Sequence, residues 1–299
     1  MPDDFEIYYV TASTSVDVRD RAMNYGDGCF TSILFNGDNF CLLKEHIDRL
    51  FDDATCLSFN LDKSEFQKGL LSPLKNIKSQ YNGQHKAIKV LVSRGVGGRG
   101  YQTPEHVTVN IYITVHDCLP PQYPKEMSLD YEYHLGVCDF SLASQSLFAG
   151  VKHLNRLEQV LAKQRLKRYS YLDDFIMLDS NNRLVEATSA NIFVKLAGYW
   201  CTPRIENAGV DGVMRRHVMK TMLEQGIEIK TRDIYIDDLQ QAQSVFLTNA
   251  ISLVIPVSHL HLKNKANESI TLNDTDQSTV KELMSLFVSN TLYSELVLE

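Results

Sequence analysis

Hydrophobic and polar positions follow a strand pattern and then a helix pattern in the first part of the chain. Two apolar stretches at 29–35 and 40–43 flank Asn36-Gly37-Asp38, a sequence typical of a tight turn between antiparallel strands. From His46 to Ala54, apolar residues recur three and four positions apart, which predicts a helix. Further elements are expected at 63–81 (a helical stretch interrupted by Pro73), 87–93 and 107–114 (both strands). This part is therefore expected to be a small α+β domain.

A proline-containing segment separates this part from the rest of the chain. Residues 118–125 include Pro120, Pro121 and Pro124, which makes this segment the best candidate for a linker. We therefore expect a small domain at 1–119 and a larger domain at 120–299. In the larger domain the same patterns predict helices near 154–168, 213–225 and 275–292, and strands near 175–178, 191–195, 244–247 and 253–257.

Composition and charge argue against several classes of function. The 299 residues include 30 Lys and Arg against 37 Asp and Glu, a net charge of −7, so we expect no nucleic-acid partner. The N-terminal residues are acidic and no apolar run has the length of a membrane span, so we expect a cytoplasmic protein without a membrane partner. The six cysteines are scattered and no histidine has zinc-ligand spacing, so we expect reduced thiols and no metal site.

The glycine-rich segment at 94–100 contains a formal G-x-G-x-x-G sequence after a predicted strand. A dinucleotide site would need a helix to begin there, whereas Tyr101-Gln102-Thr103-Pro104 and a further strand follow. We therefore expect a loop that brings Arg94 and Arg99 to an anionic ligand, because arginine side chains match carboxylates. A glycine-rich surface hairpin is the alternative interpretation.

Lys152 is the candidate reactive residue. It lies in the sequence GVKHLNRLEQ, between the apolar residues Val151 and Leu154 and just before a helical pattern. Partial burial beside such neighbours favours the neutral amine that covalent chemistry requires. An exposed, solvated lysine is the more common situation for this residue type, so the assignment depends on companion residues.

Four other segments carry groups that would complement a reactive lysine. Glu186 lies between apolar and small residues, where a carboxylate could hold a proton on a heterocyclic nitrogen. Residues 208–215 open a helix with two glycines, an arrangement that offers backbone N–H groups to a phosphate. The strand end at 248–252 has small polar residues, and Arg49 could supply a permanent positive charge. Each feature alone has an ordinary structural explanation, such as a surface acid or a loop before a helix.

Taken together, these groups match what pyridoxal 5'-phosphate requires from its protein. A lysine binds this cofactor covalently, an acid keeps the pyridine nitrogen protonated, and an arginine and a helix N-terminus bind the phosphate. The set of residues therefore predicts pyridoxal 5'-phosphate as the cofactor.

The same segments resemble the fold-type IV superfamily of pyridoxal phosphate enzymes, which includes the branched-chain and D-amino-acid aminotransferases. Within it the chain is most similar to the 4-amino-4-deoxychorismate lyase family, chiefly through RGVGGRGY and VKHLNRLEQ. The resemblance is carried by residues 20–31 (DRAMNYGDGCFT), 46–50 (HIDRL), 93–101, 150–159, 184–193 and 209–215. It implies an α+β fold with two domains, of which the larger has a barrel-like β core, and a homodimer.

The resemblance also implies a role for each matching residue. Lys152 would bind the cofactor covalently and act as the acid/base, while Glu186 would pair with the pyridine nitrogen. The phosphate would be held by Arg49, the backbone of Val213 and Met214, and the loop containing Asn249 and Ala250. The substrate pocket would be formed by Tyr25, Phe30, Thr31 and Ser32, with Arg94 or Arg99 toward a carboxylate and Thr31 or Ser32 near the departing oxygen. Aminotransferases of the superfamily place a tyrosine a few residues past the lysine, where this chain has Asn155-Arg156.

The implied activity is that of a lyase of folate biosynthesis, which converts 4-amino-4-deoxychorismate to 4-aminobenzoate and pyruvate. A branched-chain or D-amino-acid aminotransferase of the same fold is the main alternative, since it would use nearly the same cofactor contacts. A non-enzymatic member of the fold and an unrelated α/β binding module are the remaining alternatives.

Overall fold

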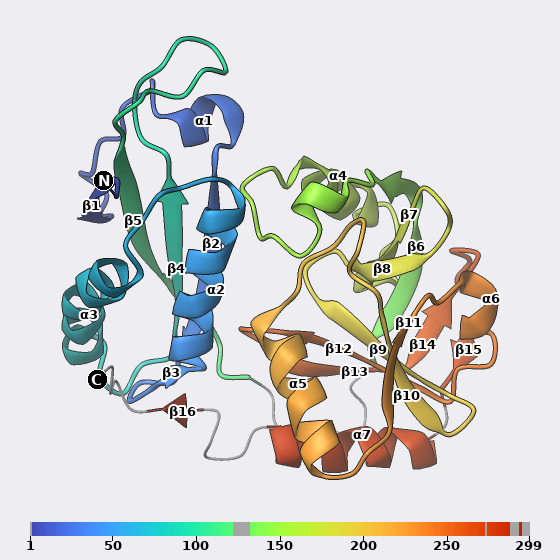
Figure 1. Cartoon of the computed structure of the whole chain (residues 1–299). Coiled ribbons are helices and arrows are strands. Elements are labelled where there is room, and N and C mark those ends of the chain that lie inside the picture. Colours follow the sequence, from blue (N-terminus) through green and yellow to red (C-terminus); the bar gives the residue numbers. More distant parts are fainter. Residues whose placement is uncertain (1, 122–131, 273, 288–292, 295–299) are drawn as a thin grey trace. The chain divides into compact units, whose positions relative to one another are not determined.

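The computed structural model describes residues 2–121, 132–272, 274–287 and 293–294, and the chain forms two compact units (Figure 1). The first unit contains the chain up to Pro120, the segment Val151–Asn155 and the C-terminal strand. The second unit contains Pro121–Gly150 and Arg156–Ser289. A short internal segment therefore belongs to the first unit, although the residues on both sides of it belong to the second.

The first unit is built around one mixed six-stranded sheet. Its strands are β1 (Asp4–Tyr9), β2 (Gly28–Phe35), β3 (Phe40–Cys41), β4 (Lys86–Ser93), β5 (Thr108–Asp117) and β16 (Tyr293–Ser294). They lie in the order β1-β5-β4-β2-β3-β16, with β1 parallel to β5 and the other neighbours antiparallel. The predicted hairpin is confirmed, since Phe35 pairs with Phe40 and the Asn36 side chain accepts hydrogen bonds from the main-chain N–H groups of Asp38 and Asn39.

Two long helices pack against this sheet. Apolar side chains of α2 (Leu43–Cys56) and α3 (Lys63–Gln80) share one buried cluster with alternate residues of β2, β4 and β5. The expected interruption at Pro73 was wrong, because α3 is continuous through this residue. A proline there removes one main-chain hydrogen bond, while Leu70 and Leu74 stay buried on the packed side and hold the helix in place. A short helix, α1 (Arg21–Tyr25), precedes β2.

The second unit contains two five-stranded sheets. Their strands are β6 (His134–Leu142), β7 (Asp174–Asp179), β8 (Leu184–Ala187), β9 (Asn191–Leu196), β10 (Tyr199–Pro203), β11 (Ile229–Arg232), β12 (Ser244–Asn249), β13 (Leu253–Val257), β14 (His259–His261) and β15 (Ile270–Thr271). One sheet has the order β11-β10-β9-β12-β13 and the other β15-β14-β6-β7-β8. One apolar cluster draws on strands of both sheets, so they pack against each other. The described strands form this packed pair and no closed ring of hydrogen-bonded strands.

The helices of the second unit are α4 (Leu157–Leu166), α5 (Val213–Glu224), α6 (Ile236–Leu239) and α7 (Asp274–Phe287), with a 3₁₀ turn at Ser146–Phe148. Helices α5 and α7 contact each other and β12. Helix α4 begins later than the pattern predicted, because residues 151–155 are part of the first unit. The predicted end of the last helix, beyond Phe287, and part of the predicted linker lie outside the described residues. The α+β class is confirmed.

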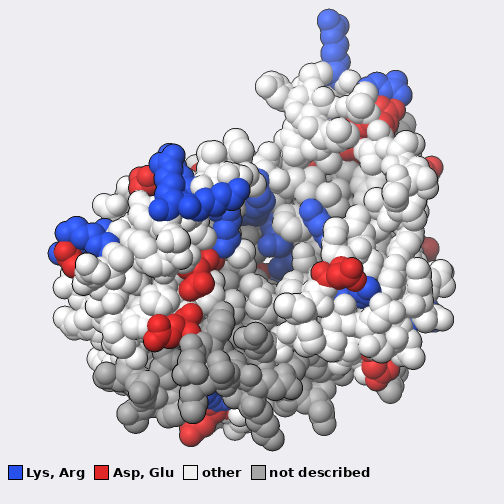
Figure 2. Space-filling model, turned by 180° about the vertical axis from the view of Figure 1, so that it is seen from behind, with Lys and Arg blue, Asp and Glu red and all other residues white. Residues whose placement is uncertain are grey.

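The surface carries charges of both signs. On the face drawn in Figure 2, much of the surface is uncharged, and acidic side chains lie close to several of the lysine and arginine groups. Among the described residues, no helix combines the length and the apolar character needed to cross a membrane.

A buried ion-pair cluster holds the start of β2 and the glycine-rich loop of the first unit. The Asp27 carboxylate accepts hydrogen bonds from Arg21 Nε at 2.8 Å and from Arg94 Nε at 2.9 Å. These three side chains are between 5% and 16% exposed. The arginines also donate to main-chain carbonyl groups: those of Gly97, Gly100, Tyr101 and Gln102 from Arg21, and those of Leu57 and Ser58 from Arg94. Asp27 therefore neutralises two guanidinium groups that tie separate segments together.

We predict that Asp27→Asn lowers the free energy of unfolding by about 3 kcal/mol, because it leaves two buried guanidinium groups without their carboxylate. Asp17→Asn is the matched control, since Asp17 pairs with Arg19 at the surface, where the Arg19 side chain is 75% exposed. Urea-induced unfolding followed by circular dichroism measures both variants. Equal unfolding midpoints for Asp27→Asn and Asp17→Asn would contradict the prediction.

Candidate active site

The segment containing Lys152 pairs with the first residues of β2. Cys29 and His153 form an antiparallel bridge, and the Phe30 N–H donates to the Lys152 carbonyl at 3.0 Å. This register places Lys152 directly opposite Phe30. Accordingly, Lys152 Nζ lies 4.7 Å from the centre of the Phe30 ring. Backbone pairing therefore holds the candidate reactive lysine on the first unit.

Two side chains complete the anchoring of this segment. The main-chain N–H of Lys152 donates to Asp53 Oδ2 at 3.1 Å, and Asp53 is buried on α2. At the other end, Asn155 Nδ2 donates to the Gly26 carbonyl at 3.2 Å. A Cβ atom on Gly26 would come within 2.3 Å of the Asn155 amide, so this contact requires glycine. Asn155 thus has a structural contact inside the first unit.

Consecutive residues of β2 point to opposite faces of the sheet. Thr31 is buried together with the residues that face α2. Phe30 and Ser32 are half-buried on the other face, and Lys152 lies on that face because it is opposite Phe30. Of the two hydroxyl groups predicted to assist catalysis, Ser32 is therefore the one that shares a face with the lysine.

Thr31 belongs to a buried hydrogen-bonded group with two residues of α2. Arg49 Nη2 donates to the Thr31 hydroxyl, which lies 2.7 Å from His46 Nδ1. Burial, together with the nearby Arg49 and Lys152, holds the pKa of His46 well below its usual value, so the ring is neutral. Because arginine can only donate, the Thr31 hydroxyl donates to Nδ1, and His46 Nε2 carries the ring hydrogen. This buried N–H has no hydrogen-bond partner among the described residues.

The same group extends to the lysine segment. Arg49 Nε lies 3.8 Å from Asp53 Oδ2, the atom that accepts the Lys152 main-chain hydrogen bond. Sequence reasoning predicted Arg49 but did not single out His46 or Asp53. The helical pattern could have identified them, because His46 and Asp53 are polar residues on the side of α2 that also buries Ile47 and Leu50.

Lys89 is a second lysine on the face that carries Lys152. It pairs with Ser32 across β2 and β4, and its Nζ lies 4.7 Å from the centre of the Phe30 ring. Burial lowers the pKa of Lys89. Lys89 was not among the predicted site residues, although a charged residue between the buried Ile88 and Val90 marks the second face of β4.

The two arginines of the glycine-rich loop lie in different environments. Arg94 is buried and bound to Asp27, so it anchors the loop, whereas Arg99 is exposed. The ring of Tyr25 packs against that of Tyr101, with 5.6 Å between their centres. As predicted, the loop leads from β4 to β5 and no helix begins within it. Of the two arginines predicted for a substrate carboxylate, Arg99 is the accessible one.

In the second unit, Glu186 fixes the loop that precedes α5. Its Oε2 atom accepts a hydrogen bond from the Val210 N–H at 2.9 Å, and the side chain is buried on β8. Asn191 Nδ2 donates to the carbonyl of the same Val210 at 2.8 Å. The main chain of Gly150 bonds to Gly209 and Asp211 in this loop. A rigid, buried carboxylate of this kind is suited to hold a proton on a ring nitrogen.

The N-terminus of α5 has no side-chain cap. Gly212 occupies the capping position, and the Asp211 carboxylate instead accepts hydrogen bonds from two arginines of the first turn. Asn191 Oδ1 approaches Gly212 so closely that a Cβ atom there would lie 2.2 Å away. The first helical residues, Val213 and Met214, thus present their main-chain N–H groups at an end of the helix that suits an anion.

The second predicted phosphate loop, which contains Asn249 and Ala250, follows β12 in the sheet that also contains β9. Thr248 near the end of β12 pairs with Asn191 at the start of β9, the residue that contacts the cap of α5. Asn249 Oδ1 accepts hydrogen bonds from the main-chain N–H groups of Ile251 and Ser252, at 2.9 and 2.7 Å. These bonds close a tight turn that includes Ala250. The strand register therefore brings together two loops that are far apart in the sequence.

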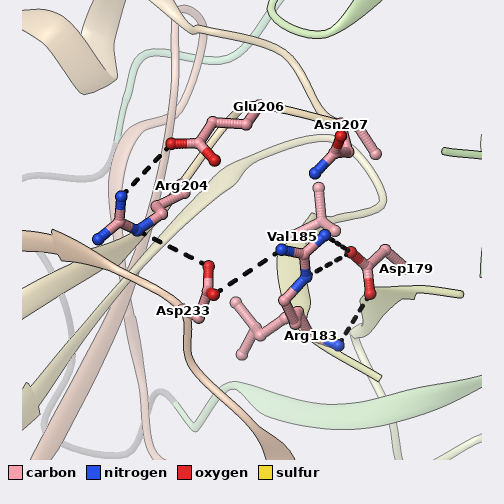
Figure 3. Close-up of a pocket in the computed structure, with 9 residues that line it drawn as sticks. Asp179, Arg183, Val185, Arg204, Glu206, Asn207 and Asp233 are labelled. Atoms are coloured by element: carbon pink, nitrogen blue, oxygen red, sulfur yellow. Dashed lines mark hydrogen bonds and ion pairs between the residues drawn. The ribbon is translucent and has the colours of Figure 1, made fainter. Parts of the chain in front are cut away.

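A small polar pocket beside β8 is a separate feature (Figure 3). It is lined by Asp179, Arg183, Leu184, Val185, Arg204, Glu206, Asn207, Ala208 and Asp233. Arg183 lies 2.7 Å from Asp179 and Arg204 lies 3.4 Å from Glu206, while Asp233 is within 3.8 Å of both arginines. The positive groups are compensated by carboxylates of the pocket itself, and no predicted site residue lines it.

The chain is similar to proteins of known classes over most of its length. Residues 28–260 match the family model described as amino-transferase class IV. Aminodeoxychorismate lyase of Vibrio harveyi is 32% identical over 82% of this chain and 87% of its own. A putative branched-chain-amino-acid aminotransferase of Methanocaldococcus jannaschii is 31% identical over 86% of this chain and 87% of its own.

A solved structure is also similar to this chain over most of its length. The crystal structure of 4-amino-4-deoxychorismate lyase from Pseudomonas aeruginosa superposes with a TM-score of 0.77 at 30% identity, covering 91% of this chain and 95% of that one. This likeness confirms the α+β fold expected from the resemblance, whereas the expected barrel-like core is a packed pair of open sheets among the described strands. The extent of the family match and these identities establish the family: the chain belongs to the class IV aminotransferases.

Proposed function

We propose that this protein is a pyridoxal 5'-phosphate-dependent lyase that converts 4-amino-4-deoxychorismate to 4-aminobenzoate and pyruvate. The observation that carries the proposal is the pairing of the Lys152 segment with β2, because it holds Lys152, Ser32 and Lys89 on one face of the sheet. The similarity to the lyases of V. harveyi and P. aeruginosa supports this choice of reaction.

Each unit, taken by itself, has residues that fit the cofactor. In the first unit, Lys152 would bind it covalently, and the buried Arg49 with its neighbour His46 would offer N–H donors to the phosphate. In the second unit, the uncapped N-terminus of α5 suits the phosphate and the buried Glu186 suits the pyridine nitrogen. The phosphate would also be held by Val213, Met214, Asn249 and Ala250. When bound, the cofactor would supply an electron sink for the charge that develops on the substrate.

The side chains on the Lys152 face fit the steps of the proposed reaction. Lys152 Nζ would take the proton from the ring carbon that carries the substrate amine. The bond between the neighbouring carbon and the ether oxygen then breaks and the remaining ring becomes aromatic, while the departing enolpyruvate takes up the proton held by Lys152 Nζ and becomes pyruvate. Ser32 Oγ would donate a hydrogen bond to the departing oxygen. Thr31 would act as a positioning residue, because its hydroxyl is already bonded to Arg49 and His46.

The substrate has two carboxylates and needs positive partners for them. Lys89 and Arg99 are the better candidates in the first unit, since Lys89 lies on the face of Lys152 and Arg99 is exposed on the glycine-rich loop. Arg94 is less suited because Asp27 and main-chain carbonyl groups already engage its guanidinium.

An aminotransferase of branched-chain or D-amino acids is the second candidate function. The chain is 31% identical to the putative aminotransferase of M. jannaschii and 32% identical to the lyase of V. harveyi, and these nearly equal identities favour this second candidate. The two functions differ in their products, because a transaminase needs a keto acid as acceptor and releases no pyruvate from an enolpyruvyl ether.

We predict that the purified protein with pyridoxal 5'-phosphate forms 4-aminobenzoate and pyruvate in equal amounts from chorismate, glutamine and the upstream synthase. Chromatography of the aromatic product and a lactate dehydrogenase assay for pyruvate measure the two products, and Lys152→Ala is the inactive control. The proposal fails if neither product is formed while the protein transfers amino groups to a keto acid.

We predict different effects for the two hydroxyl variants. Ser32→Ala should lower kcat about a hundredfold at unchanged cofactor content, because it removes a hydrogen bond to the departing oxygen. Thr31→Val should instead lower cofactor content, because Arg49 and His46 lose their shared partner. Steady-state kinetics and the visible absorbance of the bound cofactor distinguish the two effects. A Thr31→Val variant with full cofactor and a greater loss of kcat than Ser32→Ala would reverse the assignment.

A further inference from the structure

Three histidines and a glutamate gather in the second unit, at the start of strands β6 and β14. His134 begins β6 and His259 begins β14, and the parallel register of these strands places the two residues side by side. Their rings stack with 4.3 Å between centres, and His261, two positions along β14, shares their face. Glu132 lies just before β6. Its carboxylate oxygens are 3.3 Å from His134 Nε2 and 3.5 Å from His259 Nε2.

The hydrogen bonds of this group define which ring nitrogens carry hydrogen in neutral rings. The Lys265 carbonyl can only accept, so His261 Nδ1, 3.1 Å away, is the donor. His261 Nε2 is then an acceptor, and His134 Nδ1, 3.0 Å from it, must donate. This leaves a lone pair on His134 Nε2, directed at a Glu132 oxygen that is also an acceptor. Two acceptors face each other, which is an unfavourable contact unless a cation lies between them.

The distances suit a small transition-metal ion. Nitrogen and oxygen ligands lie about 2.0–2.2 Å from Zn²⁺, so neighbouring ligands of a tetrahedral site are about 3.4 Å apart. The two glutamate–histidine distances, 3.3 and 3.5 Å, match this value, and the ligand atoms of Glu132, His134 and His259 all lie within 4.8 Å of one another. A proton on His134 would satisfy one pair of atoms, whereas a metal ion would be shared by all three residues.

We propose that Glu132, His134 and His259 form a binding site for a divalent transition metal such as Zn²⁺. The three protein ligands leave the fourth tetrahedral position to water, and the exposed fractions of Glu132 (62%) and His134 (25%) make the site accessible. His261 and the Lys265 carbonyl orient His134, as outer-shell partners of metal-bound histidines do. A bound ion would connect β6 to β14 and thereby stabilise the second unit. This site is independent of the proposed cofactor chemistry.

Zinc binding to the intact protein, purified without a histidine tag and freed of metals by a chelator, tests the proposal. Equilibrium dialysis with Zn²⁺ should give one ion per chain. Glu132→Gln and His134→Ala should each weaken binding at least tenfold, and His261→Ala about tenfold. His106→Ala, which replaces an exposed histidine of the first unit, is the matched control and should bind as the native protein does. Because the Glu132 side chain is exposed, Glu132→Gln should leave the fold intact. Weaker binding by this variant therefore reports the loss of a metal ligand and not misfolding.

A second readout follows from the position of the single tryptophan, Trp200, on β10 of the second unit. Zn²⁺ should raise the temperature at which Trp200 fluorescence reports unfolding in the native protein and in His106→Ala, and should have no such effect in Glu132→Gln. The proposal is overturned if the native protein binds no Zn²⁺ at micromolar concentrations, or if Glu132→Gln and His134→Ala bind it as well as the native protein does.

Discussion

The backbone pairing between residues 151–154 and the start of β2 is the interaction on which the candidate site depends. A lysine side chain is flexible, but its useful orientations are limited when its main chain is held on both sides. Here the Phe30 N–H binds the Lys152 carbonyl and Asp53 binds the Lys152 N–H, so the position of the amine follows from the register of a sheet. The segment behaves as a short additional strand of the first unit, although its sequence neighbours belong to the second.

The alternation of side chains along β2 places two groups of functional residues on opposite faces of the sheet. One face carries Phe30, Ser32 and, through the pairing, Lys152, which are the groups suited to act on a substrate. The other face buries Thr31 against Arg49 and His46, a group suited to hold an anion. In the second unit, strand register has a comparable effect, because the pairing of Thr248 with Asn191 brings the turn after β12 to the cap of α5. Pairing geometry, rather than sequence proximity, assembles the groups within each unit.

The sequence predicts what depends on local pattern and misses what depends on long-range pairing. The Asn36-Gly37-Asp38 turn and α2 were predictable because turn chemistry and helical spacing are local signals. The continuity of α3 through Pro73 was missed, because burial against the sheet outweighs the loss of one hydrogen bond. The roles of Thr31 and Ser32 could not be separated before the face of each was known. The cluster of His134 and His259 was not predicted, because these residues are brought together by strands that are far apart in the sequence.

The most direct test of the central claim is to identify which lysine binds the cofactor. The protein is loaded with pyridoxal 5'-phosphate and reduced with borohydride, and the modified residue is located by mass spectrometry of its peptides. The account predicts modification of Lys152 alone. Lys89 is the informative alternative, because its amine lies as close to the Phe30 ring as that of Lys152. Modification of Lys89, or of any other lysine with Lys152 unmodified, would contradict the account.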